Sequence, residues 1–154
     1  MIWLFIALVV AVALAPLTHF APSKRQRQLA KMREQAALSG LFVEFRSPPG
    51  GAATERQAGA ARGGIIYYGR RLPASVAGVR QVGWLREAQG WRSVGDRVVA
   101  PACLQDLTQP VIAASIDQGS CGVYWTEAVD VADAERAVDE IGAVLDAWLT
   151  QLSD

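Results

Sequence analysis

The sequence predicts an α+β fold, in which an antiparallel sheet of about five or six strands carries a C-terminal amphipathic helix. Short segments rich in β-branched and aromatic residues follow one another between residues 41 and 127, each bounded by Gly or Pro. Tight turns separate several of these segments. A single apolar stripe then runs along residues 134–152. The chain has 154 residues, which leaves room for one domain after its apolar first segment.

The first segment, residues 1–22, is predicted to be a transmembrane anchor. It carries no charged side chain, and the stretch from Ile2 to Phe20 approaches the ~20 helical residues that cross a bilayer core. A secretory signal peptide is the main alternative. No Lys or Arg precedes the apolar run, and Pro16 directly follows the small-residue motif at 13–15, which disfavours cleavage there.

A basic segment follows the anchor and sets its expected orientation. Five cations lie within about 15 residues of the anchor's end, and none precedes it. The positive-inside rule therefore places the N-terminus in the periplasm and the body of the protein in the cytoplasm. The same cations are predicted to contact anionic lipid headgroups, each contributing on the order of 1 kcal/mol. They are Lys24, Arg25, Arg27, Lys31 and Arg33.

Residues 23–40 are predicted to form a connecting helix. Ser23 is a suitable N-cap, and Gly40 is a natural C-cap. A thin apolar stripe marks one side of this helix; it consists of Leu29, Met32, Ala36 and Leu38.

The body, residues 41–154, is predicted to begin with a strand at 41–46, where alternate residues are apolar. Residues 47–64 are rich in Gly, Pro and Ala and predict a flexible loop without secondary structure of its own. Further strands are expected within 65–73, 79–94 and 110–127. Hairpin turns are expected at residues 87–90 and 118–120, and a short helix at 101–109, between its flanking prolines.

The last segment is the clearest helix. Asp130 is a reasonable N-cap, and apolar residues recur at steps of three and four. A coiled-coil seam would give a similar stripe, but this one lasts only about three heptads. Packing across the sheet of its own domain is the simpler outcome. The stripe consists of Ala134, Val138, Ile141, Leu145, Trp148 and Leu152.

The net charge of zero conceals an asymmetry between the two halves of the chain. Residues 1–97 hold 14 basic and 5 acidic side chains, whereas residues 98–154 hold 1 basic and 10 acidic. Two explanations remain open at this stage. The halves can face and neutralise each other within one fold, or the asymmetry can mark a charged partner or surface.

No motif in the sequence predicts a catalytic, cofactor or metal site. His19 is the only histidine and lies at the edge of the anchor, so a serine nucleophile would lack the commonest base. Cys103 and Cys121 have no nearby histidine and cannot supply the four ligands of a structural zinc site. A cytoplasmic body would keep both as reduced thiols. The neighbouring carboxylates at 139–140 are expected on the solvent side of the last helix.

Aromatic and cationic residues adjoin at positions 67–71, as they do on nucleic-acid platforms. Core and rim positions of a sheet explain them more simply, and the zero net charge argues further against a nucleic-acid partner. If the protein were an enzyme at the membrane surface, Tyr67, Arg70 and Arg71 would be the best candidates to line its pocket.

Residues 1–46 resemble the YajC family. The resemblance consists of the anchor without leading positive charge, the proline near its end, the basic stretch SKRQRQLAKMREQ and the strand-like GLFVEF. YajC proteins are small single-span accessory subunits of the bacterial Sec translocase, and the resemblance implies an outside N-terminus and a cytoplasmic domain. After Gly40 the sequence departs from the family pattern, with a GWLREAQGWR hairpin and a long terminal helix.

These observations together predict a non-enzymatic, single-pass protein of a bacterial inner membrane that binds a membrane or cytoplasmic protein partner. Arginine outnumbers lysine 13 to 2, which is typical of GC-rich bacterial genomes. A Sec-translocase accessory subunit is a narrower alternative, and a membrane-surface enzyme of unknown chemistry is another.

Overall fold

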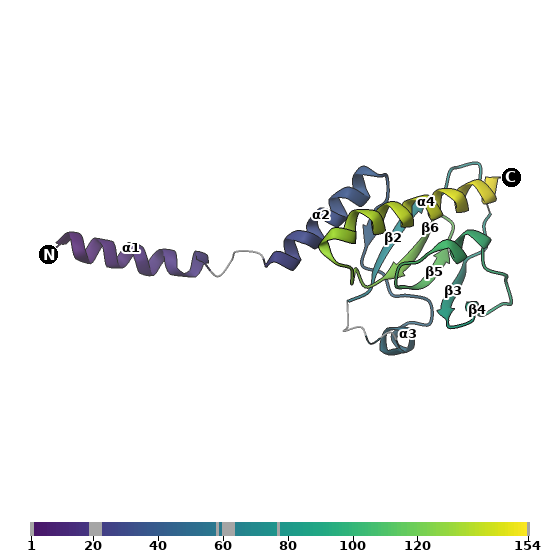
Figure 1. Cartoon of the computed structure of the whole chain (residues 1–154), viewed down its shortest axis with the longest axis horizontal. Helices are drawn as coiled ribbons and strands as arrows, with labels where there is room; N and C mark the ends of the chain where they lie inside the picture. Colours follow the sequence, from purple (N-terminus) through teal and green to yellow (C-terminus); the bar gives the residue numbers. More distant parts are fainter. Residues whose placement is uncertain (1, 19–22, 58, 60–63, 77, 154) are drawn as a thin grey trace. The chain divides into compact units, whose positions relative to one another are not determined.

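The computed structural model describes residues 2–18, 23–57, 59, 64–76 and 78–153. The chain divides into two compact units, Met1–Ala30 and Lys31–Asp154, which are described separately. The second unit contains a six-stranded antiparallel sheet and a long C-terminal helix, so the predicted α+β class is confirmed (Figure 1).

The first unit contains helix α1, Ile2–Thr18, within the segment expected to be an anchor. Among the residues that the structure describes, no helix has both the length and the apolar character that a membrane crossing requires. Residue 1 and residues 19–22 of the expected anchor lie outside the described residues, and so does His19.

Helix α2, Lys24–Leu38, occupies the predicted connecting helix and has caps at both ends. The amide of Gln26 donates to Ser23 Oγ at 3.2 Å, while Gln26 Oε1 accepts from the Ser23 amide at 2.8 Å. This reciprocal pair is a capping box. At the other end Gly40 has φ 75°, and the amide of Leu41 donates to the Ala36 carbonyl at 2.8 Å.

The second half of α2 belongs to the compact body. Met32 and Ala36 are buried, and Gln35 Nε2 donates to Asp139 Oδ1 of the C-terminal helix at 3.3 Å. The compact unit accordingly begins at Lys31, ten residues before the expected start of the body at residue 41. Leu38 departs from the predicted apolar stripe, because its side chain is 84% exposed at the end of the helix.

The six strands have the spatial order β1-β2-β6-β5-β3-β4, and every neighbouring pair is antiparallel. The two central strands, β6 and β5, are almost wholly buried. Both predicted hairpin turns are present, one joining β3 to β4 and the other joining β5 to β6. The strands are β1 Phe42–Glu44, β2 Ile66–Arg71, β3 Val82–Glu87, β4 Gly90–Val94, β5 Val111–Ile116 and β6 Ser120–Trp125.

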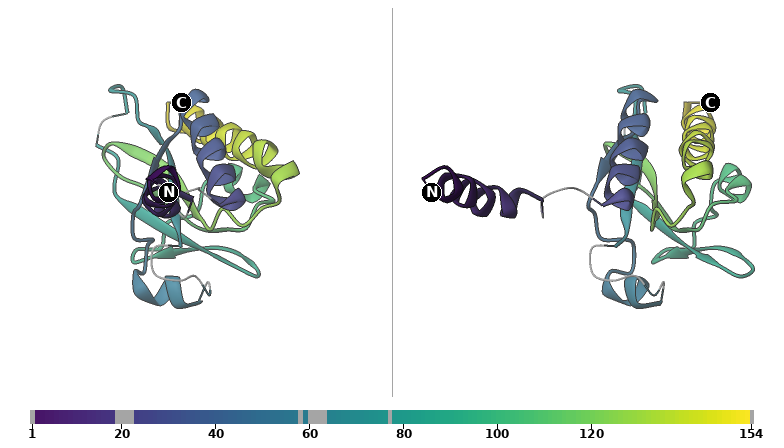
Figure 2. Two further views of the ribbon diagram at one scale, coloured as in Figure 1. Left: turned by 90° about the vertical axis from the view of Figure 1, so that its left-hand side faces the viewer. Right: turned by 60° about the vertical axis from the view of Figure 1, so that its left-hand side comes forward.

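Helix α4, Ala134–Ser153, packs across one face of the sheet (Figures 1 and 2). Its predicted stripe is buried from Ala134 to Trp148, and only Leu152 remains half-buried. Trp148 meets Trp84 of β3 edge to face, with ring centroids 5.7 Å apart. The two tryptophans fix the side of the sheet that α4 covers.

One short 3-10 helix precedes β5, and a second follows β6. The first, η1, is Ala102–Asp106 and begins after Pro101, as the sequence predicted. The second, η2, is Val131–Asp133 and leads directly into α4. The expected N-cap role of Asp130 is wrong, because this extra turn shifts the start of α4 and the Asp130 side chain makes no capping hydrogen bond.

The opposite face of the sheet is partly covered by the segment expected to be an unstructured loop. This segment contains helix α3, Ala52–Gln57, so the expectation is corrected for these residues. Thr54 is buried, and its Oγ1 donates to the Pro49 carbonyl at 2.7 Å. Pro49 itself rests on Gly83 of β3, where an added Cβ would lie 2.6 Å from the proline ring. Residues 58 and 60–63 of the expected loop lie outside the described residues.

Helix α4 supplies the first testable prediction. Replacing Ile141, which is fully buried, with Asp should destabilise the body by roughly 3–5 kcal/mol, because a carboxylate would be buried without a partner. Chemical unfolding of the full chain in detergent, followed by tryptophan fluorescence, measures the change. The matched control is Ala143→Asp, two residues along on the exposed side of α4. Equal stability of the two variants would show that α4 is not part of the core.

Candidate interaction cleft and the polar networks around it

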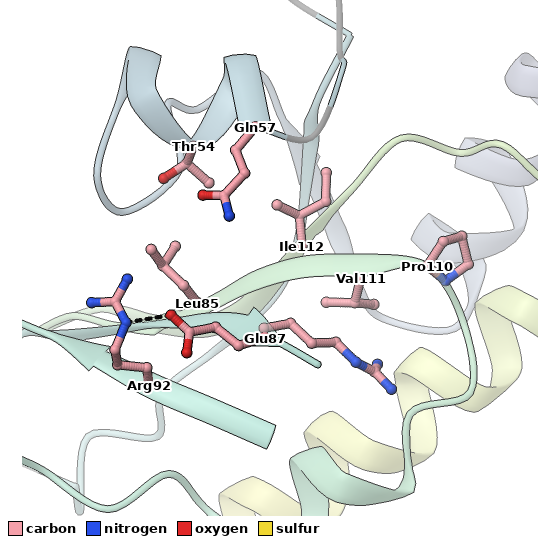
Figure 3. Close-up of a pocket in the computed structure, with 9 residues that line it drawn as sticks. Thr54, Gln57, Leu85, Glu87, Arg92, Pro110, Val111 and Ile112 are labelled. Atoms are coloured by element: carbon pink, nitrogen blue, oxygen red, sulfur yellow. Dashed lines mark hydrogen bonds and ion pairs between the residues drawn. The ribbon is translucent and has the colours of Figure 1, made fainter. Parts of the chain in front are cut away.

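A hollow of about 360 Å³, here called the α3 cleft, opens between α3 and strands β3 and β5 (Figure 3). Figure 3 shows Thr54 and Gln57 of α3 facing Leu85 and Ile112 of the sheet across this hollow. Pro49 lies against Gly83 at the start of the segment that contains α3, and α3 lies across the hollow from the sheet. Its lining consists of Thr54, Gln57, Leu85, Arg86, Glu87, Arg92, Pro110, Val111 and Ile112.

The floor of the α3 cleft is apolar and its rim is charged. Leu85 and Ile112 are half-buried and pack on a buried cluster formed by Ile65, Tyr67, Ala113 and Tyr124. At the rim, Arg92 Nε donates to Glu87 across the β3–β4 hairpin (Figure 3). An apolar floor with a polar rim is suited to receive an apolar side chain of a partner and to fix its orientation.

A second hollow, of about 530 Å³, lies on the same face beside Pro48, Pro49 and Gly83. Its only lining arginine, Arg46, is already satisfied by carboxylates. Arg46 Nη1 donates to Asp117 and Nη2 pairs with Glu44, both at 2.9 Å, while the guanidinium lies 4.5 Å from the centroid of the Tyr67 ring. Most of the N–H donors of Arg46 are therefore already used, and few are left for an anionic ligand.

The hydroxyl groups near this hollow also pair with one another. Tyr67 OH and Ser120 Oγ are 3.2 Å apart, as are Ser115 Oγ and Tyr124 OH. Burial raises the pKa of the Tyr67 phenol well above its usual range, so the group stays protonated. Burial would also raise the pKa of Asp117, but hydrogen bonds from the Gly119 and Ser120 amides outweigh it and leave that pKa lowered. The network holds the β5–β6 turn in place.

The most constrained charged group of the body is Glu127, just after β6. Its side chain is 4% exposed, and its backbone φ of 52° makes it the only non-glycine residue with positive φ among those described. Arg33 of α2 donates from Nε at 3.0 Å and from Nη2 at 2.6 Å, one bond to each carboxylate oxygen. Tyr68 OH donates to the same carboxylate at 2.7 Å. These three residues are called the Glu127 clasp below.

No local pattern in the sequence predicts the clasp, because Arg33 and Tyr68 are 94 and 59 positions away from Glu127. Hydrogen bonding to Glu127 outweighs desolvation and raises the pKa of Arg33. Burial, followed by the bond to Glu127, raises the pKa of Tyr68. Both partners therefore remain protonated donors at neutral pH, as the bidentate geometry requires.

Residues 139–140 were expected to face solvent, and this expectation is corrected for Glu140, whose side chain is bound by the body. Its carboxylate accepts from the amide and hydroxyl of Thr108 and from the amide and side chain of Gln109. Desolvation opposes these bonds, but their sum leaves the pKa of Glu140 lowered. The residue fastens α4 to the segment between η1 and β5.

Four of the five predicted membrane-surface cations lie exposed on α2: Lys24, Arg25, Arg27 and Lys31. The fifth, Arg33, has a different environment. Its guanidinium is bound by Glu127 and lies 5.5 Å from the centroid of the Phe45 ring. Arg33 therefore serves the internal packing of the body.

Tyr67, Arg70 and Arg71 do not line one pocket. Successive residues of β2 point to opposite faces, so Tyr67 and Arg71 lie on the α3 side and Arg70 on the α4 side. Arg70 donates to the Ser39 carbonyl at 2.6 Å and to Asp146 at 2.8 Å, and Arg71 lies 5.0 Å from the ring centroid of Phe42. The fully buried Tyr67 belongs to the core.

Both cysteines are buried free thiols. Burial raises the pKa of Cys103, and it raises the pKa of Cys121 to about 12. A thiol in such surroundings is a poor nucleophile at neutral pH, since the thiolate is the reactive form. Within the described ranges, no three His, Cys, Asp or Glu side chains converge as metal ligands would.

No protein-family model, curated protein or solved structure matches this chain. The resemblance of residues 1–46 to the YajC family stays a prediction.

The Glu127 clasp gives a prediction about stability. Replacing Glu127 with Ala should lower the free energy of unfolding by roughly 3–5 kcal/mol, because Arg33 and Tyr68 lose their shared acceptor inside the body. The double variant Arg33→Met with Glu127→Leu should lose less than the sum of the two single changes, because it removes both charges together. Chemical unfolding of the full chain in detergent measures all of these variants.

The control for this experiment is Glu135→Ala, at an exposed position in the first turn of α4. It should change the unfolding free energy by no more than about 0.5 kcal/mol. Strictly additive effects at positions 33 and 127 would contradict the clasp.

Glu140 gives a prediction about pH. Its pKa is lowered in the folded chain, so it stabilises the body above its unfolded pKa, and this contribution is lost as pH falls through the folded pKa. Glu140→Gln should be less stable than the parent by about 1–2 kcal/mol at pH 7. The difference should shrink between about pH 5 and pH 3, as the parent carboxylate protonates. Unfolding measured at several pH values tests this, with Glu135→Gln at an exposed position of α4 as control; a difference independent of pH would refute it.

Proposed function

We propose that this protein is a membrane-anchored interaction module without catalytic activity. In this proposal residues 1–22 hold the chain in a bacterial inner membrane, with the N-terminus in the periplasm. The α+β body lies in the cytoplasm and offers the α3 cleft to a protein partner. The observation that carries the proposal is the apolar surface of α1.

Helix α1 exposes large apolar side chains on all its sides. Trp3 is 82% exposed, and even the least exposed member of the set, Ile6, is 46% exposed. Because residues 2–6 span more than a full helical turn, these side chains leave no polar face. A helix that is apolar all round is stable only inside an apolar medium, such as a core or a bilayer. The set is Ile2, Trp3, Leu4, Phe5, Ile6, Leu8, Val9 and Val10.

Helix α1 alone is slightly shorter than the hydrocarbon core of a bilayer. Its 17 residues correspond to roughly 26 Å at 1.5 Å per residue, compared with a hydrocarbon core of about 30 Å. The proposed anchor therefore includes the residues that follow α1. The exposed cations of α2 then come next in the chain, where the positive-inside rule expects the cytoplasmic headgroups.

The body supports binding better than catalysis. The arginine and hydroxyls beside the larger hollow are satisfied by one another, and the two cysteines are buried with raised pKa values. The α3 cleft instead combines an apolar floor with a charged rim. Such a site gains free energy from excluding water around a partner's side chain and needs no reactive group.

The anchor predicts the behaviour of the chain in membrane fractions. The full chain should stay in the pellet when membranes are extracted with alkaline carbonate. Replacing Leu8 with Lys and Val9 with Glu should release most of it, because each charge costs roughly 2.5–3.5 kcal/mol at the centre of a membrane helix. The control is Leu38→Lys, at an exposed position of α2, which should remain in the pellet.

The topology is tested in the same membranes. A phosphatase that works only in the periplasm should be inactive when fused after Asp154 and active when fused before residue 2. Release of the parent chain by carbonate would refute the anchor, whereas an active C-terminal fusion would refute the orientation alone.

A further inference from the structure

Strand β4, Gly90–Val94, forms one edge of the sheet and pairs only with β3 in the described part of the chain (Figure 1). The other edge strand, β1, has three residues and is too short to pair with more than a few groups of a partner. With five residues, β4 is the edge at which another strand could add.

The hairpin register shows which backbone groups of β4 point outward. Residues 88–89 form a two-residue turn, so Glu87 and Gly90 are its closing, hydrogen-bonded pair. Hydrogen-bonded and non-bonded pairs then alternate, which leaves the amides and carbonyls of Trp91 and Ser93 directed away from β3. No backbone hydrogen bond joins Trp91 or Ser93 to another of the described segments.

The side chains of Trp91 and Ser93 are already held, so the edge is preformed. Trp91 Nε1 donates to the Leu104 carbonyl at 3.1 Å, and Arg86 lies 5.7 Å from the centroid of its ring. Ser93 Oγ accepts from the Val98 amide at 3.4 Å. A rigid edge loses little conformational entropy when a second strand binds to it.

A shallow groove runs along this edge, between β4 and the segment that follows it. Its far wall includes Arg97, Val98 and Val99, and the side chain of Val99 is 91% exposed. Glu87 and Arg92 line both this groove and the α3 cleft, so the two hollows adjoin. A strand lying along β4 would therefore pass the charged rim of the α3 cleft.

The charge of this region indicates the kind of partner. Residues 78–100 hold four arginines and two acidic side chains, a net charge of +2. Arg80 pairs with Asp96, Arg92 pairs with Glu87, and Arg86 donates to backbone carbonyls. Arg97 has no ion pair among the described residues and lines the groove. A second copy joined through β4 would bring two such positive regions together, and an acidic strand would neutralise one.

We propose that β4 binds an extended acidic segment of a partner protein by strand addition. The outward backbone groups of Trp91 and Ser93 supply main-chain hydrogen bonds, and Arg97 selects carboxylates. This deepens the proposed function by naming the partner chemistry at the rim of the α3 cleft. It rests on the body being an interaction module and does not depend on the anchor.

The test uses the full chain in detergent and two synthetic seven-residue peptides. One alternates valine with glutamate, and the other alternates valine with lysine. Fluorescence anisotropy measures binding, and amide hydrogen exchange measures protection of the Trp91 and Ser93 backbone amides. We expect the acidic peptide to bind at least about tenfold more tightly than the basic one and to slow exchange at both amides.

Four variants separate the backbone contribution to binding from the side-chain contribution. Ser93→Pro removes an outward amide that β3 does not use, and an edge strand tolerates this change; binding should fall at least about tenfold. Ser93→Ala keeps the amide and should bind within about twofold of the parent. Arg97→Glu should weaken the acidic peptide at least about fivefold, whereas Arg56→Glu, the same charge change on α3, should not.

Several outcomes would overturn the inference. These are no binding of the acidic peptide, equal binding of both peptides, binding unaffected by Ser93→Pro, or amides at 91 and 93 that are already protected in the free chain. The last outcome would indicate an edge covered by a second copy. Because none of these outcomes alters extraction by carbonate or the reporter fusions, the strand-addition proposal and the membrane anchor fail separately.

Discussion

The carboxylate of Glu127 is the group on which the arrangement of the body depends. It is buried at the end of a central strand, and its backbone adopts a left-handed conformation that a glutamate rarely takes. Each of these conditions costs free energy unless neighbours compensate. Arg33 and Tyr68 provide three hydrogen bonds to its two oxygens. The carboxylate can therefore be buried only if α2 lies where Arg33 reaches it, and this fixes the helix against the body.

The same constraint explains why the compact unit begins within α2. Met32 and Ala36 flank Arg33 on the helix and are buried. The apolar contacts provide most of the free energy of packing but little directional preference, whereas the bidentate pair fixes the rotation and register of the helix. The capping geometry at Gly40 then ends α2 and turns the chain into β1.

Much of the fold follows from local patterns in the sequence. The strands, the two hairpin turns, the short helix after Pro101 and the buried stripe of α4 are each encoded by adjacent or periodically spaced residues. The order of the strands and the position of the edge are not, since they result from pairings between distant segments. Helix α3 was not predicted, because six residues are too few to show a helical period of apolar residues. It is stabilised instead by the hydrogen bond from Thr54 to the Pro49 carbonyl.

The candidate site was less predictable than the fold for the same reason. The α3 cleft combines residues from three separate segments, and its floor is recognisable only once the sheet pairs Leu85 with Ala113. Tyr67, Arg70 and Arg71 adjoin in sequence, yet the alternation of β2 separates them onto two faces. Glu127 is an ordinary surface residue by type, and only the fold shows that it is buried.

The basic and acidic halves of the chain neutralise each other in some parts of the body and not in others. Arg33, Arg46 and Arg70 from the basic half pair with Glu127, Asp117 and Asp146 from the acidic half. These three bridges support mutual neutralisation, and all of them involve α2, β2 or the residues just after β1. The β3–β4 hairpin shares in none of them, because its ion pairs join residues of its own segment. Arg97, which follows β4, therefore keeps a charge without an ion pair among the described residues. The sheet edge beside it also has open backbone groups, and both features favour an acidic strand as a partner.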